Sequence, residues 1–251
     1  MSTIFDLGGK VAIVTGANTG IGQAIALSLA AAGADIAAVG RTPAEETVEK
    51  VRALGRKAEI VSADLSSIEP VQRVVDETIA KLGGLDILIN NAGIIRRADS
   101  VDFTEEDWDA VIDTNLKSTF FLAQAAGRHM LAQGGGKIVN IASLLSFQGG
   151  IRVPSYTASK SGVAGLTKLL ANEWAAKGVN VNAIAPGYIA TNNTAALQAD
   201  ETRNRQIQER IPAGRWGDPG DIGGAAVFLA SPAANYIHGH VLAVDGGWLA
   251  R

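Results

Sequence analysis

The amino-acid sequence predicts one α/β domain, a doubly wound parallel sheet of about seven strands with helices on both faces. Short runs rich in Val and Ile alternate with longer segments of helical periodicity along all 251 residues. Most of these runs are apolar at successive positions, as in strands that helices cover on both faces. A strand–helix–strand repeat requires right-handed crossovers, which place the strands parallel to one another. A chain of this length commonly forms a single domain of this class, so we assign residues 1–251 to one domain.

The predicted elements follow one another from the first strand to the last. The expected strands are Val11–Val14, Ile36–Val39, Ile60–Val61, Ile87–Ile89, Ile138–Ile141, Val179–Ile184 and Val241–Val244. The expected helices are Gly20–Ala32, Ala44–Leu54, Ile68–Leu82, Glu105–Met130, Tyr156–Ala175 and Asp221–Ala230. The least regular stretch, residues 187–219, carries one helical piece near Gln198–Arg210. Because long irregular segments in compact domains often cover a site, we predict a lid on the substrate side, with a plain surface excursion as the alternative.

The composition excludes several functional classes. The chain has no cysteine, which rules out disulfides and thiolate-bound metals, and its formal net charge of −3 offers no basic footprint for nucleic acid. No apolar run approaches the roughly 18 residues of a membrane span, and the first ten residues lack the pattern of a signal peptide. His129, His238 and His240 have no further ligand near them in sequence. We therefore expect a cytoplasmic protein without a membrane partner, a nucleic-acid partner or a metal.

A glycine-rich turn follows the first strand and opens the first helix. Its sequence is Thr15-Gly16-Ala17-Asn18-Thr19-Gly20-Ile21-Gly22. Glycine lets the backbone approach a phosphate closely, and the first free N–H groups of a helix favour an anion. Sheets of this class hold a dinucleotide pyrophosphate at this place, although the spacing differs from G-x-G-x-x-G. The residues predicted to bind a cofactor here are Gly16, Asn18, Thr19, Gly20, Ile21 and Gly22.

The end of the second strand bears on the choice of cofactor. An acidic side chain at this place binds the ribose hydroxyls of NAD, whereas an arginine accommodates the 2′-phosphate of NADP. The strand ends in Val39-Gly40-Arg41-Thr42, without an acid, and Asp35 lies at the opposite end of the strand. Arg41 therefore favours NADP(H), with stacking on adenine or exposure to water as the alternative.

Ser143, Tyr156 and Lys160 predict a proton-transfer site. Ser143 ends the fifth strand, and Tyr156 and Lys160 lie four residues apart, on one face of a helix. Reduction of a ketone needs a hydride for carbon and a proton for oxygen. A nearby ammonium lowers the pKa of a tyrosine from about 10 toward working pH, where it is a better acid–base catalyst, and a serine hydroxyl stabilises negative charge on the substrate oxygen. The alternative is a Tyr and a Lys on a solvated helix face.

At these residues the chain resembles the short-chain dehydrogenase/reductase family over nearly its whole length. The residues that match the family's catalytic tetrad in order and spacing are Asn115, Ser143, Tyr156 and Lys160. The resemblance implies a Rossmann fold, an NAD(P)-dependent alcohol/ketone oxidoreductase, and an asparagine that helps to hold a water relaying protons to the lysine. It also implies that Tyr156 and Lys160 contact the cofactor. The further cofactor residues that it implies are Asp64, Leu65, Asn91, Ala92, Gly93, Pro186, Gly187, Ile189 and Thr191.

Several loops resemble those members of the family that act on sugar acids of the 2-dehydro-3-deoxy-D-gluconate or 2-deoxy-D-gluconate type. The segments that carry this resemblance are Ile95–Arg97, Leu144–Ser155, Ala190–Thr194, Ile211–Trp216 and Asp245–Arg251. Such enzymes usually use NAD, so NAD and NADP are both candidate cofactors. Guanidinium groups bind carboxylates in a bidentate manner, unless these arginines serve subunit contacts or face water. The candidate substrate residues are Arg96, Leu145, Gln148, Arg152, Asn192 and Trp216, with Arg97 and Asn193 beside them.

Two other functions stay open. The same chemistry would serve another carbonyl substrate, as in a gluconate 5-reductase, a plain sugar dehydrogenase or a reductase of 3-ketoacyl thioesters on an acyl carrier. A nicotinamide-binding sensor without turnover is the second alternative, although such a module needs no proton relay. The resemblance also implies a homotetramer formed through the two long helices and the C-terminal region. We expect the C-terminal tail, with Arg251, to approach the site of a neighbouring subunit.

Overall fold

The computed structural model describes residues 3–251, so the first two residues of the predicted domain lie outside it. Seven parallel strands form one sheet in the order β3-β2-β1-β4-β5-β6-β7. The strands are β1 (Val11–Thr15), β2 (Asp35–Gly40), β3 (Ala58–Ser62), β4 (Ile87–Asn90), β5 (Gly136–Ile141), β6 (Val179–Pro186) and β7 (Val241–Val244). All seven predicted strands are confirmed, most of them slightly longer than expected.

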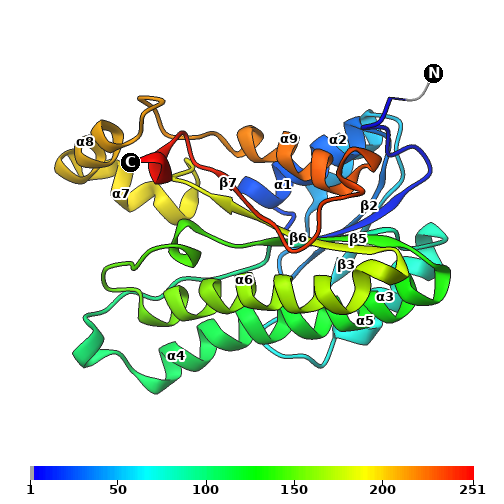
Figure 1. Ribbon diagram of the computed structural model, residues 1–251, viewed down its shortest axis with the longest axis horizontal. Helices are drawn as coiled ribbons and strands as arrows, with labels where there is room; N and C mark the ends of the chain where they lie inside the picture. Colours follow the sequence, from blue (N-terminus) through cyan, green and yellow to red (C-terminus); the bar gives the residue numbers. More distant parts are fainter. Residues whose placement is uncertain (1–2) are drawn as a thin grey trace.

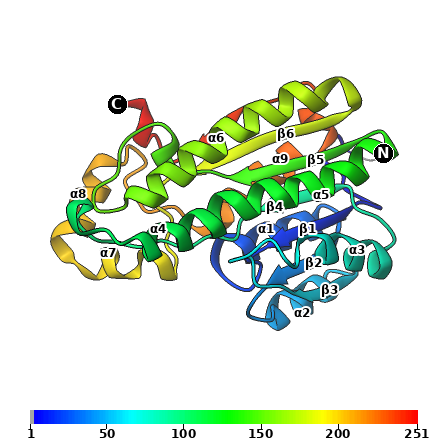
Figure 2. The same cartoon turned by 90° about the horizontal axis from the view of Figure 1, so that it is seen from below.

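Helices cover both faces of the sheet, as predicted (Figures 1 and 2). One face carries α1 (Gly20–Ala31), α2 (Glu45–Ala53) and α9 (Pro219–Ala230). The other face carries α3 (Val71–Leu82), α5 (Ser118–Gln133) and α6 (Pro154–Trp174). The inner strands β1 and β4 are buried throughout, and β2 nearly so, which explains their apolar runs. No helix within residues 3–251 is long and apolar enough to cross a membrane.

The strand order changes direction between β1 and β4. The chain runs outward from β1 to β3 on one side and from β4 to β7 on the other, so the loops after β1 and β4 leave in opposite directions. Val14 of β1 lies beside Ile89 of β4, which aligns the ends of the two strands. A crevice at the carboxyl ends of the strands is where such sheets bind ligands.

The predicted helix Glu105–Met130 is divided in the structure. Helix α4 (Glu105–Ile112) is followed by a wide π-helical turn, Asp113–Lys117, before α5 begins. Hydroxyl groups supply donors to the carbonyls of this turn: Thr119 Oγ1 donates to Asn115 O at 2.9 Å. Hydrophobic periodicity does not distinguish a π turn from an α turn over so few residues, so the sequence predicted one continuous helix. Single π turns in helices occur frequently at functional sites.

Residues 187–219 form a helical cap over one end of the molecule, beside the C-terminus (Figure 1). The single predicted piece Gln198–Arg210 is two helices, α7 (Ala195–Ala199) and α8 (Glu201–Arg210). They divide at Asp200, whose carboxylate accepts a hydrogen bond from the Arg203 N–H at 3.0 Å and so caps α8. The apolar cluster beneath this cap consists of Leu144, Ile207, Ile211, Trp216 and Trp248. The cap therefore has a small core of its own, shared with the C-terminal turn Trp248–Ala250.

Candidate active site

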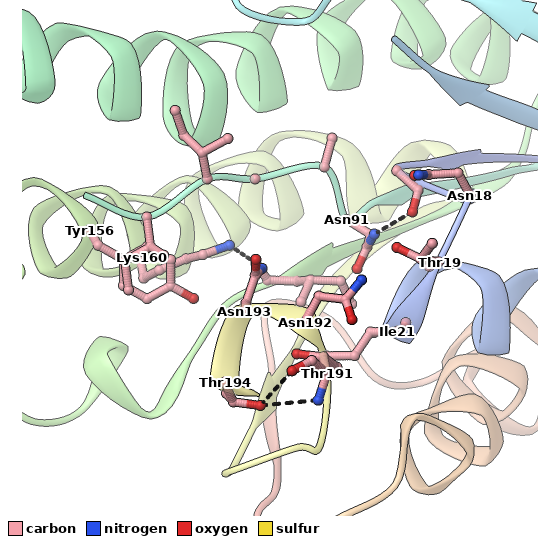
Figure 3. A pocket seen from close by; sticks show the side chains of 18 of the residues that line it. Asn18, Thr19, Ile21, Asn91, Tyr156, Lys160, Thr191, Asn192, Asn193 and Thr194 are labelled. Atoms are coloured by element: carbon pink, nitrogen blue, oxygen red, sulfur yellow. Dashed lines mark hydrogen bonds between the residues drawn. The ribbon is translucent and has the colours of Figure 1, made fainter. Parts of the chain in front are cut away.

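Two adjoining cavities lie at the carboxyl ends of the strands. The first, here called the turn cavity, is bordered by the glycine-rich turn and by residues that include Asn91, Tyr156, Lys160 and Thr191 (Figure 3). The second, here called the lid cavity, lies between the loop after β5, the end of β6, helices α7 and α8, and Trp248. The residues that line both are Ile95, Arg97, Tyr156 and Thr194. Tyr156 therefore stands where the two cavities meet.

The glycine-rich turn is shaped to receive an anion. A Cβ on Gly22 would lie 2.1 Å from Gly16 O, so no larger residue fits without moving the turn. Gly16 and Gly20 have φ angles of +64° and +56°, in the left-handed region that favours glycine. Within the described chain no side chain caps the N-terminus of α1, whose first residues line the turn cavity. Its free N–H groups and helix dipole fit the pyrophosphate of a dinucleotide.

Asn91 fastens the turn to the neighbouring strand. Its Nδ2 donates to Thr15 O at 2.9 Å and to Gly16 O at 3.3 Å. The hydroxyl of Thr15 in turn accepts from the N–H groups of Asn91 and Ala92, both at 2.9 Å. With Ala92 and Gly93, Asn91 borders the turn cavity, so the predicted position is found there. Its side chain, however, holds the protein backbone.

Arg41 and Asp64 lie outside the lining of the turn cavity, at the ends of the adjacent strands β2 and β3. The Arg41 side chain is 81% exposed, and its Nη1 lies 4.0 Å from Asp64 Oδ2. The hydrogen bond from the Ser66 N–H and, to a smaller degree, the charge of Arg41 lower the pKa of Asp64 below its ordinary range. An exposed pair this far apart contributes little, so the guanidinium is available to another anion. Leu65 and Ile189 are buried in the protein interior, 6% and 4% exposed, and line neither of the two cavities.

Helix α6 presents Tyr156 and Lys160 on one face. The helix begins with Pro154, whose fixed φ suits the first helical position. Lys160 is 5% exposed, and its Nζ donates to Ile141 O at 2.6 Å. The same Nζ lies 5.6 Å from the centre of the Tyr156 ring. Burial lowers the pKa of Lys160 from 10.5 to about 8.

Burial dominates the acidity of Tyr156. It raises the pKa of the phenol above its ordinary value, and a hydrogen bond with Ser143 and the charge of Arg97 oppose that shift. The sequence argument expected Lys160 to lower this pKa. That expectation is not met in the protein alone, because the removal of water from the phenolate outweighs the nearby positive charges. The groups that favour the phenolate are Ser143 and Arg97.

Asn115 acts on the site through the backbone. Its Oδ1 accepts from Ile94 N and its Nδ2 donates to Ile94 O, both at 2.8 Å. This pairing fixes the loop after β4, from which Ile94 and Ile95 line the turn cavity. Nδ2 also lies 3.4 Å from the hydroxyl of Ser159 on α6. The structure thus brings all four predicted tetrad residues together around one end of α6.

The comparisons with known proteins agree with this geometry. A family model described as Enoyl-(Acyl carrier protein) reductase matches residues 16–249. The 2-dehydro-3-deoxy-D-gluconate 5-dehydrogenase of Escherichia coli K12 is 60% identical over 248 residues, which cover 98% of each chain. The chain belongs to the short-chain dehydrogenase/reductase family. It is therefore an NAD(P)-dependent oxidoreductase.

Two further relatives of this short-chain dehydrogenase carry related names. The 2-dehydro-3-deoxy-D-gluconate 5-dehydrogenase of Bacillus subtilis 168 is 58% identical, over 98% of this chain and 97% of its own. A crystal structure from Agrobacterium tumefaciens, provisionally assigned as a 2-deoxy-D-gluconate 3-dehydrogenase, contains bound NADP. It is 62% identical with a TM-score of 0.94, over 99% of this chain and 100% of its own.

The predicted substrate residues of this short-chain dehydrogenase do not all reach its cavities. Leu145, Gln148 and the neighbouring Arg97 line the lid cavity, with Pro186 and Gly187, while Asn192, Asn193 and Thr191 line the turn cavity. Arg96 instead pairs with Asp107 at 3.2 Å, and Arg152 pairs with Asp99 at 3.0 Å. Trp216 lies beneath the cap and donates its Nε1 to Asn204 Oδ1 at 2.7 Å. These three side chains line neither the turn cavity nor the lid cavity.

Several residues of the lid cavity were missed in the sequence. They are Tyr188, Leu197, Arg203, Gln206, Ile207, Arg210 and Trp248. Four of them recur on α8 at the i, i+3, i+4 and i+7 spacing that marks one helix face. That spacing can be read from the sequence, but the sequence does not show which part of the protein this face of α8 packs against.

Proposed function

We propose that the protein interconverts the secondary alcohol and the ketone of a sugar acid of the 2-dehydro-3-deoxy-D-gluconate or 2-deoxy-D-gluconate type. The observation that carries this proposal is the charge of the lid cavity. Three arginines line it, Arg97, Arg203 and Arg210, and no Asp or Glu from the described chain does. The cavity opens onto Tyr156, so a small acid bound there can present its carbonyl to the phenol. The names of the relatives at 58% and 60% identity support the same substrate class.

The turn cavity is the proposed place of NAD(P). The uncapped N-terminus of α1 would hold the pyrophosphate, and Lys160 and Tyr156 would lie beside the nicotinamide end. When bound, the nicotinamide supplies or accepts the hydride. Arg41 supports the use of NADP(H), because its exposed guanidinium suits a 2′-phosphate. The bound NADP of the 62% identical Agrobacterium protein supports it too.

The residues of the chain handle the proton. In the reducing direction, Tyr156 Oη gives its proton to the substrate oxygen as the hydride reaches the carbon, so the ketone becomes a neutral alcohol. Ser143 lines the lid cavity together with Tyr156, and its hydroxyl donates to the same oxygen and stabilises the charge that develops on it. A protonated Lys160 stabilises the phenolate that remains. Asn115 keeps the loop after β4 in place around the reacting groups.

The first test is the reduction of 2,5-diketo-3-deoxygluconate with NADPH and NADH side by side. Tyr156→Phe should lower kcat by about 100-fold or more, because it removes the proton donor of the reaction. Its dissociation constant for NADPH should change little, which fluorescence titration measures. A wild-type enzyme that binds NADPH but reduces only D-gluconate-derived ketones or 3-ketoacyl thioesters would contradict the proposed substrate. Full activity in the Tyr156→Phe variant would contradict the proposed proton donor.

We further propose that the protein is a cytoplasmic homotetramer. An apolar groove runs between the π-helical turn, α5 and α6, and its lining residues are Ile112, Leu116, Lys117, Phe120, Phe121, Gly162, Gly165 and Leu166. An apolar surface of this kind on two long parallel helices is suited to burial against a second copy. The lack of cysteine accords with a reducing compartment.

A further inference from the structure

Helix α8 directs one face into the lid cavity. Arg203, Gln206, Ile207 and Arg210 all line this cavity, and Ile207, only 2% exposed, anchors the face in the apolar cluster beneath the cap. The two arginines therefore reach the cavity from a helix that is seated on the protein, which limits how far their backbones can move. A third arginine, Arg97, reaches it from the loop after β4.

The three arginines of the lid cavity differ in their hydrogen bonds. The guanidinium of Arg97 donates to Asn193 O at 3.4 Å, and that of Arg203 donates to Gln206 Oε1 at 2.8 Å. The guanidinium of Arg210 has no hydrogen-bond or carboxylate partner within residues 3–251. By contrast, Arg205 on the same helix lies 3.8 Å from Glu209. Arg210 thus keeps all five of its N–H donors free.

Arg210 is nevertheless held in position. Its guanidinium carbon lies 4.0 Å from the centre of the Trp248 ring. Trp248 is 4% exposed, packs 4.7 Å from the Tyr188 ring, and donates Nε1 to Gln148 Oε1 at 3.3 Å. Stacking engages the flat face of a guanidinium and leaves its in-plane N–H groups available to a planar anion. A guanidinium supported in this way loses little freedom when it binds a carboxylate.

We propose that Arg210, supported by Trp248, binds the carboxylate of the substrate. This inference rests on the proposed function and adds an orientation to it: the acid end of the substrate lies at α8 and the reacting carbon lies at Tyr156. Arg97 serves the other end, because it lines both cavities, as Tyr156 does. Trp248 is a positioning residue, since it touches the guanidinium and not the reacting atoms.

The test compares 2,5-diketo-3-deoxygluconate with its methyl ester, which has the same skeleton without the charge. Arg210→Ala should lower kcat/KM for the acid by about 10- to 100-fold, the range for a hydrogen-bonded charged pair. The same variant should change kcat/KM for the ester by less than about twofold, and KM for NADPH should stay as in the wild type. Arg205→Ala is the matched control, an exposed arginine on the same helix that does not line the cavity, and it should leave both substrates unaffected.

Equal losses for the acid and the ester would overturn the inference, because they would mean a structural role for Arg210. Unchanged kinetics with the acid would overturn it as well. A wild-type protein that reduces neither compound would contradict the proposed function, and a binding measurement then judges Arg210 separately. Calorimetry with D-gluconate and D-glucitol on the NADP-bound protein should show a preference for the acid that Arg210→Ala abolishes. The absence of that preference, or its persistence in the variant, would also refute the carboxylate site.

Discussion

At the scale of single residues, the site removes two ionisable groups, Tyr156 and Lys160, from water. Burial raises the pKa of Tyr156 and lowers that of Lys160 to about 8, so it shifts both groups toward their neutral forms, although Lys160 still carries its proton at neutral pH. A positive charge arriving beside the phenol shifts it toward the phenolate. Lys160 and Arg97 are the cations next to it, one near its ring and one acting on its charge. Tyr156 and Lys160 are thus arranged so that a small change in local charge alters whether the phenol of Tyr156 holds its proton.

The buried lysine should reduce the stability of the protein at neutral pH. A pKa lowered from 10.5 to about 8 corresponds to about 3 kcal/mol of unfolding free energy. The unfolded chain binds the extra proton between these two pH values, so the free energy of unfolding rises with pH through this window. Below about pH 8 the whole cost is present. Lys160→Met should therefore raise the melting temperature at pH 7, and its advantage over the wild type should shrink toward pH 10.

Thermal denaturation at several pH values measures this effect. Lys168→Met is the control, because Lys168 is an exposed lysine on the same helix. It should give no pH-dependent gain. A Lys160→Met protein less stable than the wild type at pH 7 would mean that the hydrogen bond of Lys160 to Ile141 O outweighs the cost of burying its charge.

At the scale of elements, the C-terminal tail is bound to the end of α8. Arg251 donates Nη2 to Glu209 O at 2.6 Å and Nε to Arg210 O at 3.1 Å. These are carbonyls of the last helical turn, which have no partner within the helix. Within the described chain the tail therefore contacts α8. Its approach to the site of a neighbouring subunit stays a prediction.

Removal of this contact should loosen α8. Arg251→Ala should increase hydrogen–deuterium exchange in residues 201–210 and raise KM for the sugar acid several-fold, less than Arg210→Ala does. Exchange in α1 and KM for NADPH should not change, because the turn cavity lies away from the tail. Exchange unchanged in α8 would mean that Ile207 and Asp200 suffice to hold the helix.

Elements whose pattern is dictated by burial were predictable, and contacts between distant side chains were not. The seven strands follow from their apolar runs. Residue type and spacing indicated Ser143, Tyr156 and Lys160, whereas Asn115 was indicated by the family resemblance. Arg96 and Arg152 were chosen as substrate residues because they lie in the right loops, but Asp107 and Asp99 bind them on the surface. Arg210 was not chosen, because its role depends on Trp248, which follows it by 38 positions and meets it only in the fold.

At the scale of the whole molecule, the apolar groove beside α5 and α6 predicts association. Leu166→Glu places a charge in this groove and should dissociate the proposed tetramer, which sedimentation velocity detects. Glu49→Lys, a charge reversal on the exposed surface of α2, should leave the sedimentation coefficient unchanged. A wild-type protein that sediments as a monomer would refute the assembly, and an unchanged Leu166→Glu tetramer would refute this groove as its interface.

The two cavities meet through Ile95, Arg97, Tyr156 and Thr194. Arg41 lies at the end of β2, outside the lining of the turn cavity, and Arg210 lies on α8, where it lines the lid cavity. A mutation at one of these arginines therefore leaves the surroundings of the other intact. With the proposed roles of these two arginines, substitutions that alter the choice of cofactor and substitutions that alter the choice of sugar acid act at separate places, and neither changes the proton transfer proposed for Tyr156.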